Sequence, residues 1–447
     1  MKTFEFHTLG CKVNQYETEA MEELLERHGY RPRKEGETSD LLVINTCTVT
    51  HVSDAKSRQQ IRKMKRENPS AIVAVVGCYA QVAPQEIEAI EGVDIILGTK
   101  GRARLPELIR QVEETGLRQV DVGNLDEQTE FDALSISTEE SMTRATIKIQ
   151  EGCDMFCSYC IIPYARGHIA SRPLDDIVEE AERLASGGFR EIVLTGIHVA
   201  SYGQGLRSSM DVSGGSVRER RQDLVDVVEA IAKVPAVERI RMSSIEPRWV
   251  TRDRLFRLRA TGKVCPHFHL SLQSGSDLIL RQMNRKYDTA LYAQKVDLIR
   301  EVFPDAGLTT DVIVGFPGET EKEFEETLEF VQRVGFSRMH IFPYSPREGT
   351  PAALFTGQVD PQIKKARAMR LEKEEERLRY AFMDQHIGSV LDVLIEEKRS
   401  EEGWPTGYSG NYLRVSIQDE EVSTGEVVGV QIDARKGDLL FGHRFKA

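Results

Sequence analysis

Short apolar runs alternate with helix-patterned stretches along the first part of the chain. The runs expected to form strands are Phe4–Thr8, Leu41–Asn45 and Ile72–Val76. The stretches between them that have helical periodicity are Glu17–His28 and Ser53–Glu67. Strand–helix alternation predicts a parallel sheet with crossover helices. We therefore expect an open α/β domain over residues 1–115.

The same alternation continues through residues 139–370, where six strand–helix units are predicted. The expected strands are Ala145–Gln150, Glu191–Thr195, Arg239–Ser243, Phe268–Leu272, Thr309–Val314 and Arg338–Phe342. The expected helices are Asp175–Ser186, Asp223–Lys233, Thr251–Ala260, Ser276–Met283, Thr289–Val302 and Glu321–Val334. Six successive units predict a partial (β/α)6 barrel of parallel strands, whose chemistry belongs at the carboxyl ends of those strands.

Two polar stretches interrupt this pattern. Asp126–Ser141 is acidic and weakly periodic, and we interpret it as a linker. Ser201–Gln222 is rich in Gly, Ser and Arg, which favours a surface loop. By contrast, Thr320 and Glu323 have the spacing of a capping box, which predicts that a helix begins just after Thr320.

The pattern changes after a long charged helix predicted over Pro361–His386. From Val390 onward, short β-branched runs are separated by glycines, which favours a small β-barrel. We place this third, all-β domain at residues 374–441. The complete fold class is then α/β with a small all-β barrel at the carboxyl end.

Composition and charge restrict the compartment and the partners. The chain has 447 residues, 40% of them hydrophobic, and a net charge of −12. The longest apolar run, Ala71–Ala80, is shorter than the roughly 20 residues that span a bilayer, and no signal peptide is visible. We therefore expect a cytoplasmic protein without membrane contact. The acidic balance argues against a surface that binds nucleic acid everywhere, but it permits a local basic face.

Three of the seven cysteines each follow a predicted strand of the first domain. They are Cys11, Cys47 and Cys78. The carboxyl ends of parallel strands share one edge of a sheet, so these three thiols are expected to converge. The alternative is that they are buried core thiols. Cys265 stands apart, and we expect it to be a core or loop thiol.

Cys153, Cys157 and Cys160 form a C-x3-C-x2-C run directly after a predicted strand. Three thiolates at this spacing suit three irons of a cubane 4Fe-4S cluster and leave the fourth iron open. Structural zinc sites have four ligands, usually from two separated C-x2-C pairs. A zinc loop is therefore the weaker alternative.

The C-x3-C-x2-C motif and the sequence around it resemble the radical S-adenosylmethionine methylthiotransferase family. The resemblance rests on the C-x3-C-x2-C run and on CSYCIIPYARGHIASRP, HLSLQSGSDLILRQMNRKY and DVIVGFPGET in the barrel. It extends to TLGCKVNQYETE, INTCTVT and VVGCYAQ in the first domain, and GYSGNYLRV resembles the family's RNA-binding TRAM domain. Nearly the whole chain is covered.

This resemblance implies the cofactors. Cys153, Cys157 and Cys160 would hold one 4Fe-4S cluster, whose open iron binds S-adenosylmethionine as radical source and methyl donor. Cys11, Cys47 and Cys78 would hold a second, auxiliary 4Fe-4S cluster that carries the sulfur. No catalytic residue beyond the cluster ligands is implied, and an electron donor such as flavodoxin or ferredoxin is expected.

The resemblance also implies the reaction. The residues after Cys11, KVNQYET, resemble the branch that methylthiolates C2 of N6-threonylcarbamoyladenosine at position 37 of tRNA. The alternatives within the family are isopentenyladenosine at position 37 of tRNA and a ribosomal protein side chain. An iron–sulfur carrier with an RNA-binding tail is the alternative from a different class. The oligomeric state is not indicated.

Further candidate residues lie at strand ends and on basic or aromatic stretches. Candidates for contact with the cofactor are Tyr159, Gly196, Ser243, Glu246, Gln273 and Gly315. The plainer interpretations are loop packing for Tyr159 and turns for the glycines. Candidates for contact with RNA are Arg62, Lys63, Arg66, Tyr412 and Arg414, together with Tyr408, Lys446 and the arginines of the insertion, Arg207, Arg218, Arg220 and Arg221. A basic run such as the first three is otherwise a solvated helix face.

Overall fold

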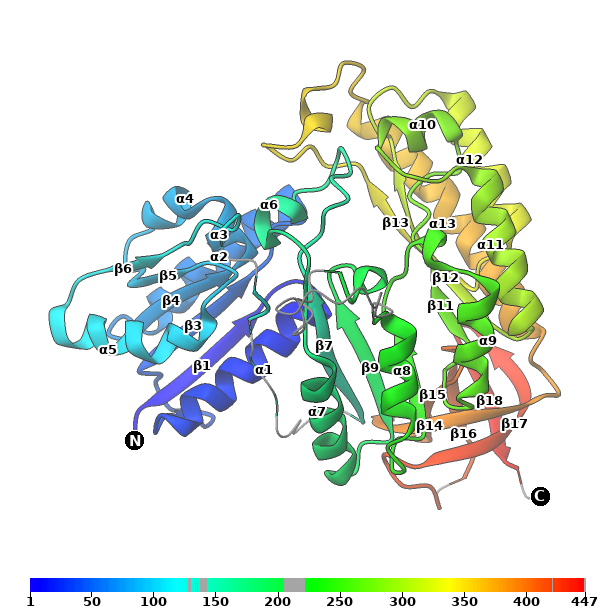
Figure 1. Cartoon of the computed structure of the whole chain (residues 1–447), viewed down its shortest axis with the longest axis horizontal. Helices are drawn as coiled ribbons and strands as arrows, with labels where there is room; N and C mark the ends of the chain where they lie inside the picture. The colour runs from blue at the N-terminus through cyan, green and yellow to red at the C-terminus, as the bar shows by residue number, and fades with distance from the viewer. Residues whose placement is uncertain are drawn as a thin grey trace, which may run out of the picture.

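The computed structural model describes the chain except for residues 128–129, 133, 135, 137–142, 205–221, 420 and 446–447. An α/β unit at the amino end lies beside a central unit of parallel strands, and a small β-barrel lies below the central unit (Figure 1). The predicted fold class is confirmed. Within the described part of the chain, no helix is both long and apolar enough to cross a membrane.

The amino-terminal unit is one sheet of parallel strands in the order β2-β1-β3-β4-β5-β6. The strands are β1 (Thr3–Thr8), β2 (Arg31–Pro32), β3 (Leu41–Thr46), β4 (Ile72–Gly77), β5 (Ile95–Leu97) and β6 (Gln119–Asp121). The helices are α1 (Lys12–Arg27), α2 (His51–Glu67), α3 (Cys78–Val82), α4 (Pro84–Glu88) and α5 (Leu105–Thr115), with the short 3-10 turn Arg102–Arg104. Every residue of β3 is buried because helices cover both faces of the sheet.

This sheet reaches further along the chain than the predicted limit at residue 115, because β6 forms its last strand. The described residues of the predicted linker are also part of this unit. Leu134 and Ile136 are buried in its core, and the Tyr16 hydroxyl donates to the Leu134 carbonyl. These residues pack rather than forming a free linker, while much of the remaining stretch lies outside the described residues.

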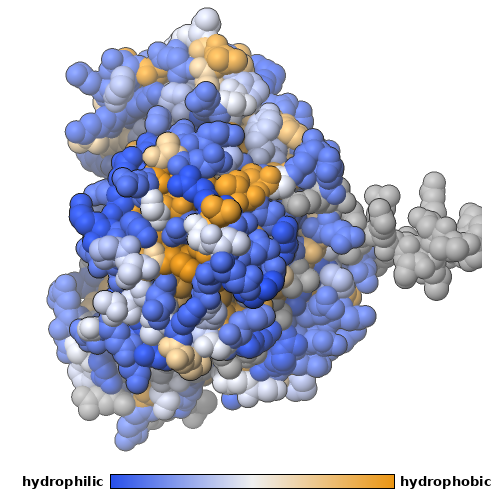
Figure 2. Space-filling model, turned by 90° about the vertical axis from the view of Figure 1, so that its left-hand side faces the viewer, coloured by the Kyte–Doolittle hydropathy of each residue, from blue (hydrophilic) through white to orange (hydrophobic). Residues whose placement is uncertain are grey.

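The face seen in Figure 2 is mostly hydrophilic, with apolar side chains gathered near the middle and at the top of the view. The edge strand β6 exposes Val120, and Leu117 just before it is also exposed. An edge strand has unpaired backbone groups, and charged neighbours commonly protect it from pairing with other chains.

The central unit has six parallel strands, as predicted. They are β7 (Arg144–Glu151), β9 (Glu191–Gly196), β10 (Arg239–Met242), β11 (His267–His269), β12 (Gly307–Val314) and β13 (Arg338–Pro343). They form two sheets, β10-β9-β7-β8 and β11-β12-β13, in which β8 (Ala170–Ser171) is a short antiparallel edge strand. Isolated bridges such as Ile245 to Leu270 connect the two sheets. The partial barrel is therefore continuous between β10 and β11 and open between β7 and β13.

Helices cover the outside of this partial barrel. They are α6 (Ile162–Arg166), α7 (Leu174–Ser186), α8 (Leu224–Ala232), α9 (Arg252–Ala260), α10 (Asp277–Gln282), α11 (Thr289–Val302) and α12 (Glu321–Val334), with short 3-10 turns at Val199–Ser201, Pro247–Trp249 and Pro351–Leu354. The predicted capping box is present at the start of α12. Most of the predicted Ser201–Gln222 loop, including Arg207, Arg218, Arg220 and Arg221, lies outside the described residues.

Alternate residues of the central strands have different surroundings. Ile147, Ile192 and Ile240 are buried in the main hydrophobic core beneath the helices. Strand side chains alternate between the two faces of a sheet, so Lys148 and Arg241 lie on the opposite, inner face. The inside of the partial barrel is therefore lined largely by polar side chains rather than filled with apolar ones.

A long helix, α13 (Pro361–Asp384), leads to the carboxyl-terminal barrel. Its strands are β14 (Val390–Arg399), β15 (Pro405–Ser409), β16 (Arg414–Ile417), β17 (Val427–Lys436) and β18 (Leu439–Arg444), closed in the order β14-β15-β16-β18-β17. The barrel docks at the amino ends of the central strands. Arg239 donates to the Tyr408 carbonyl at 3.1 Å, and Arg241 donates to the Gly410 carbonyl at 3.0 Å.

Candidate functional site

The structure places Cys11, Cys47 and Cys78 at one edge of the amino-terminal sheet. Cys11 precedes α1, Cys47 follows β3, and Cys78 is the first residue of α3. Their strands β1, β3 and β4 are neighbours in the sheet. Gly10 has φ +115°, and a Cβ there would lie 2.9 Å from the Cys47 Cβ, so only glycine allows this close approach. The three thiols are neighbours, and none is in a disulfide.

Arg166 of the central unit contacts the thiol of Cys78. Its Nε donates to Cys78 Sγ at 3.1 Å. Its Nη2 donates to Asn14 Oδ1 at 2.6 Å and to Glu17 Oε2 at 3.0 Å, while Nη1 contacts Glu151 Oε1 at 3.1 Å. The Arg166 side chain is fully buried. One guanidinium therefore joins the amino-terminal helix α1, the central strand β7 and a candidate metal ligand.

This buried network has more positive than negative charge. Its cations are Lys100, Arg102, Lys148 and Arg166, and its carboxylates are Glu17, Asp132 and Glu151. Four positive charges thus face three negative ones. Buried charge is costly unless it is balanced, so an anionic group beside Arg166 fits this site. Burial raises the pKa of Cys78 to about 11, and iron ligation would convert the thiol to the thiolate that supplies this charge.

Cys153, Cys157 and Cys160 lie in the loop after β7, and other parts of the central unit fix that loop. The Ser158 amide donates to the Met283 carbonyl at 3.1 Å, and the Ser158 carbonyl accepts from the Ala352 amide at 2.8 Å. Phe156 has φ +44°, an uncommon conformation for a bulky residue. The Asn284 side chain holds the Phe156 carbonyl at 2.9 Å.

Burial raises the pKa of the Cys153 thiol to about 11 and that of Cys160 to about 12. Among the described residues, no three or more His, Cys, Asp or Glu side chains are gathered closely enough to hold a single metal ion. In a 4Fe-4S cluster each thiolate binds its own iron, so the ligands need not converge on one point. The two sets of three cysteines therefore fit two cubane clusters.

The short helix α6 separates the two sets. It begins two residues after Cys160 and ends at Arg166, whose side chain reaches Cys78. Five helical residues span about 7.5 Å. One end of α6 therefore follows the first set of cysteines, and its other end contacts Cys78 of the second set, at the junction of the amino-terminal and central units.

Arg285 is a functional candidate that sequence reasoning missed. Its Nη1 donates to Cys157 Sγ at 3.2 Å, and its Nε donates to the Tyr287 hydroxyl at 3.0 Å. Its charge also acts on Glu246 and His198. Arg285 is part of the sequence RQMNRKY, but no spacing rule distinguishes it from the other arginine of that stretch, Arg281.

The inner side of this loop region contains polar atoms that have no partner in the described part of the chain. One is Glu246 Oε1, while the other oxygen of that carboxylate accepts from the Arg248 amide at 3.2 Å. Another is His198 Nε2. Burial, with the Arg285 charge as a smaller contribution, lowers the pKa of His198 to about 4. Such atoms are available to a polar ligand at the carboxyl ends of the strands.

The other predicted strand-end residues have contacts within the protein. Ser243 donates to Thr195 Oγ1 at 3.3 Å, and Gln273 has φ +70° and pairs with β12. Gly196 lies so close to β7 that a Cβ would be 2.8 Å from the Gln150 carbonyl. Gly315 has φ +70°, and a Cβ there would collide with Lys364. Tyr159 packs against the small apolar group of Ile279, Met283, Phe316, Tyr344 and Ala352.

These contacts favour the plainer interpretation for Tyr159 and for both glycines. Tyr159 packs the cysteine loop, Gly315 occupies a left-handed turn, and Gly196 permits a close approach between neighbouring strands. A role in cofactor binding stays a prediction for all six strand-end and loop residues.

The basic residues of α2 lie on its outer face. Arg62, Lys63 and Arg66 are exposed and line a shallow depression, and none of them has an ion pair within the described residues. Helices of a parallel α/β sheet run back from the carboxyl edge of the strands, so the start of α2 is near Cys47. Arg62 lies about 16 Å further along the helix. The basic face is therefore beside the candidate auxiliary site but not at it.

The ring of Tyr412, a predicted RNA contact, packs within the protein, and a role of this residue in RNA binding stays a prediction. Its ring stacks on His267 with 4.8 Å between ring centroids and on Tyr408 with 4.9 Å. The Arg241 guanidinium lies 4.7 Å from the same ring. The ring therefore serves the contact between the carboxyl-terminal barrel and the central strands. Arg414 is exposed, and Lys446 lies outside the described residues.

Family models match two parts of the chain. The radical SAM superfamily model matches residues 147–331, and the model of uncharacterized protein family UPF0004 matches residues 3–98. A Bacillus subtilis protein named threonylcarbamoyladenosine tRNA methylthiotransferase MtaB is 41% identical over 97% of this chain and 94% of its own length. An Acetivibrio thermocellus protein named tRNA-2-methylthio-N(6)-dimethylallyladenosine synthase is 35% identical over 99% of this chain and 90% of its own length.

Solved structures agree on the fold. The radical S-adenosylmethionine methyltransferase TsrM from Kitasatospora setae, with tryptophan substrate and an S-adenosylmethionine analogue bound, superposes with a TM-score of 0.57 at 15% identity. The match covers 86% of this chain and 90% of that one. At this identity the similarity shows the fold alone.

The matches bear directly on the predicted cofactors and family. They confirm S-adenosylmethionine and two 4Fe-4S clusters as the cofactors. The full-length relatives at 35% to 41% identity confirm the family that the cysteine motifs and the surrounding text resemble. The chain therefore belongs to the radical S-adenosylmethionine methylthiotransferase family.

Proposed function

We propose that this enzyme converts N6-threonylcarbamoyladenosine at position 37 of tRNA to its 2-methylthio derivative. The observation that carries the proposal is the pair of three-cysteine sets on either side of α6, joined through Arg166 to Cys78. One set can serve S-adenosylmethionine while the other presents sulfur to a substrate in the same junction. The relatives whose names include threonylcarbamoyladenosine support the choice of substrate.

The cysteines have different roles in this proposal. Cys153, Cys157 and Cys160 hold the cluster that binds S-adenosylmethionine, and Cys11, Cys47 and Cys78 hold the auxiliary cluster. When bound, the first cluster supplies the electron that cleaves S-adenosylmethionine, which gives the radical needed to activate a non-acidic C–H bond of adenine. Arg285 and Arg166 each donate a hydrogen bond to a thiolate, stabilising its negative charge.

The alternative from outside the family, an iron–sulfur carrier with an RNA-binding tail, explains less of this architecture. An iron–sulfur carrier has no need of a six-stranded partial barrel with a polar inner face, whereas an enzyme that binds a nucleoside does. The second candidate within the family is isopentenyladenosine at position 37, because relatives named for the dimethylallyl compound are 34% to 37% identical. An external electron donor such as flavodoxin or ferredoxin completes the proposal.

The test is mass spectrometry of tRNA nucleosides from cells with and without this gene. Loss of the 2-methylthio form of threonylcarbamoyladenosine on deletion, and its return with the wild-type gene, is the expected result. Loss of the 2-methylthio form of isopentenyladenosine instead would assign the second candidate. An unchanged nucleoside profile would contradict both.

A further inference from the structure

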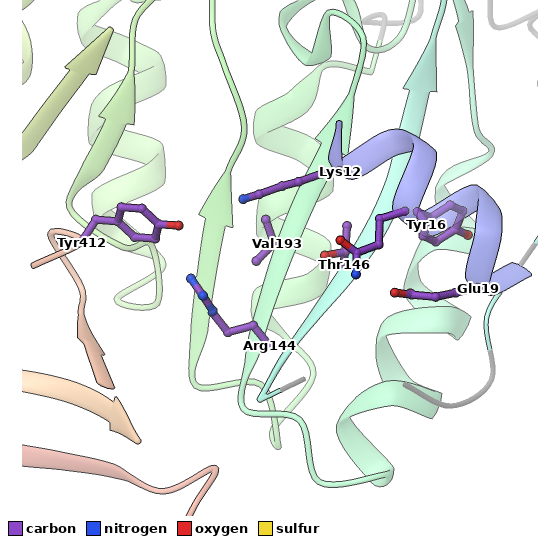
Figure 3. A pocket seen from close by; sticks show the side chains of 8 residues that line it. Lys12, Tyr16, Glu19, Arg144, Thr146, Val193 and Tyr412 are labelled. Atoms are coloured by element: carbon purple, nitrogen blue, oxygen red, sulfur yellow. The ribbon is translucent and has the colours of Figure 1, made fainter. Parts of the chain in front are cut away.

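A cavity of about 180 Å³ lies between α1, β7, β9 and the loop that precedes β16. Liquid water occupies roughly 30 Å³ per molecule, so this cavity has room for about six waters or a small polar group. Lys12 reaches it from the first turn of α1, Arg144 from the start of β7, and Tyr412 from the carboxyl-terminal barrel. The ends of these three side chains point toward the same space (Figure 3).

The cavity is lined by two cationic side chains and one carboxylate. Lys12 has no hydrogen bond and no ion pair within the described residues. Arg144 is paired with Glu396, at 2.8 Å. The carboxylate that also lines the cavity, Glu19, lies on the side away from the ends of Lys12 and Tyr412 (Figure 3).

The pKa of Tyr412 shows the effect of the positive charges around the cavity. Burial would raise the pKa of its hydroxyl, but Lys12, Arg144 and Arg241 together outweigh that effect, and the pKa lies below its usual value. The two cations thus face a neutral hydroxyl where an anion would be the stronger partner. Charge-assisted hydrogen bonds of a carboxylate to such donors are roughly twice as strong as neutral ones.

The position of Lys12 connects this cavity to the proposed reaction. Lys12 follows Cys11 directly, so their Cα atoms are about 3.8 Å apart. In adenine, C2 and the carbon that bears N6 are both bonded to N1. A base whose C2 faces the auxiliary cluster therefore directs its N6 substituent along the same edge, within reach of a neighbouring side chain. The threonylcarbamoyl substituent ends in a carboxylate, whereas the isopentenyl substituent is uncharged.

We infer that Lys12 and Arg144, with the Tyr412 hydroxyl, form the subsite for the carboxylate of the threonylcarbamoyl group. This inference rests on the proposed function and adds the residues that select its substrate. Such a subsite recognises an oxyanion that faces two cations. A tRNA backbone phosphate has that chemistry too, and the experiment distinguishes it from the carboxylate.

The experiment compares three anticodon stem-loop RNAs that differ only at position 37. They carry threonylcarbamoyladenosine, its uncharged methyl ester, and unmodified adenosine. Binding to the full chain with both clusters reconstituted is measured for the wild type, Lys12→Met and Lys12→Arg. We expect the wild type to prefer the free acid to the ester by about tenfold or more, as expected for hydrogen bonds to a charged group.

Lys12→Met should lose most of this preference, and Lys12→Arg should regain part of it, which separates lost charge from a folding defect. Lys63→Met is the matched control, because it removes a lysine charge from an exposed helix face and should weaken all three RNAs equally. A Lys12→Met variant that also weakens all three equally would assign Lys12 to a phosphate contact and overturn the inference. Unchanged acid-over-ester preference in Lys12→Met would overturn it as well.

Failure of the proposed function would look different. In that case the wild type itself would show no preference for the modified stem-loop over unmodified adenosine and would form no methylthio product from it. The wild-type arm therefore tests the function, and the Lys12 arms test the subsite.

Discussion

Single residues carry the connection between the two candidate clusters, and Arg166 is the clearest case. Its guanidinium contacts Cys78, Asn14, Glu17 and Glu151 in a region without solvent access. Arg166 is the last residue of α6, but its hydrogen-bond partners lie up to 152 positions away in the sequence. No local pattern could have predicted them. The six cysteines, by contrast, were predicted from their spacing and their places after strands.

Arg166→Met is expected to lower the free energy of unfolding of the cluster-free protein by about 1–3 kcal/mol, because Asn14, Glu17 and Glu151 each lose a buried hydrogen-bond donor. Urea unfolding measures the change. Arg110→Met is the matched control, because Arg110 is an exposed arginine paired with Glu107 and Glu114, and its loss should cost at most about 1 kcal/mol. Equal effects of the two substitutions would contradict the role assigned to the buried network.

His198 predicts a dependence of stability on pH. Its pKa falls from 6.5 to about 4 on folding, chiefly through burial. The unfolded chain therefore binds the proton more readily between pH 6.5 and 4, so this contribution to stability is complete above pH 6.5 and decreases as the pH falls toward 4. The full effect is about 3 kcal/mol.

The measurement is urea unfolding of the cluster-free wild type and of His198→Asn at several pH values between 6.5 and 5. The difference in free energy of unfolding between the wild type and His198→Asn should change by roughly 1 kcal/mol per pH unit. A difference that is independent of pH would show that His198 does not titrate in this way.

Elements with strong periodicity were predicted well, and elements defined by distant partners were not. The bounds of α11 and α12 agree with the periodicity of Thr289–Val302 and Glu321–Val334. The short strands β2, β5 and β6 were missed because two or three residues give no periodic signal. β11 is shorter than its apolar run because the Thr310 hydroxyl, rather than the β12 backbone, bonds the Leu270 carbonyl and the Leu272 amide. The docking of Tyr412 depends on tertiary contacts that no local pattern shows.

The basic face of α2 is expected to bind tRNA phosphates. Replacing Arg62, Lys63 and Arg66 by Gln should weaken tRNA binding and reduce the dependence of log affinity on log salt, because each phosphate contact contributes about 0.7–0.9 to that slope. Binding titrations at several salt concentrations measure both effects. The charge-conserving triple variant Arg62→Lys, Lys63→Arg and Arg66→Lys should keep the slope. If the Gln variant keeps it too, α2 is a solvated face.

At the scale of the whole molecule, three units meet around one polar interior. The amino-terminal unit contributes Lys12 and the candidate auxiliary site, the central strands contribute Arg144, and the carboxyl-terminal barrel contributes Tyr412. The sequence predicted three units and their fold classes. It did not predict that the loop between β15 and β16 reaches the interior, since the resemblance marked that loop only as part of an RNA-binding domain.

Truncation after Asp384 is expected to destabilise the central unit, because Arg239 and Arg241 would lose the carbonyl acceptors of Tyr408, Ser409 and Gly410. Hydrogen bonds to charged groups contribute about 1.5–3 kcal/mol each, so the midpoint of thermal unfolding should fall by several degrees. Differential scanning calorimetry of the truncated and full chains measures this. An unchanged midpoint would indicate that the barrel is an independent appendage.

The measurement that tests the central claim most directly compares the wild type with the Cys11→Ala/Cys47→Ala/Cys78→Ala variant after anaerobic reconstitution. Both proteins are incubated with S-adenosylmethionine, a reductant and tRNA that carries threonylcarbamoyladenosine. Mass spectrometry then quantifies 5′-deoxyadenosine and the methylthio nucleoside in each reaction. The account predicts that iron falls from about eight to about four atoms per chain, that 5′-deoxyadenosine still forms, and that the methylthio nucleoside is lost. A variant that still makes the methylthio nucleoside would contradict the account.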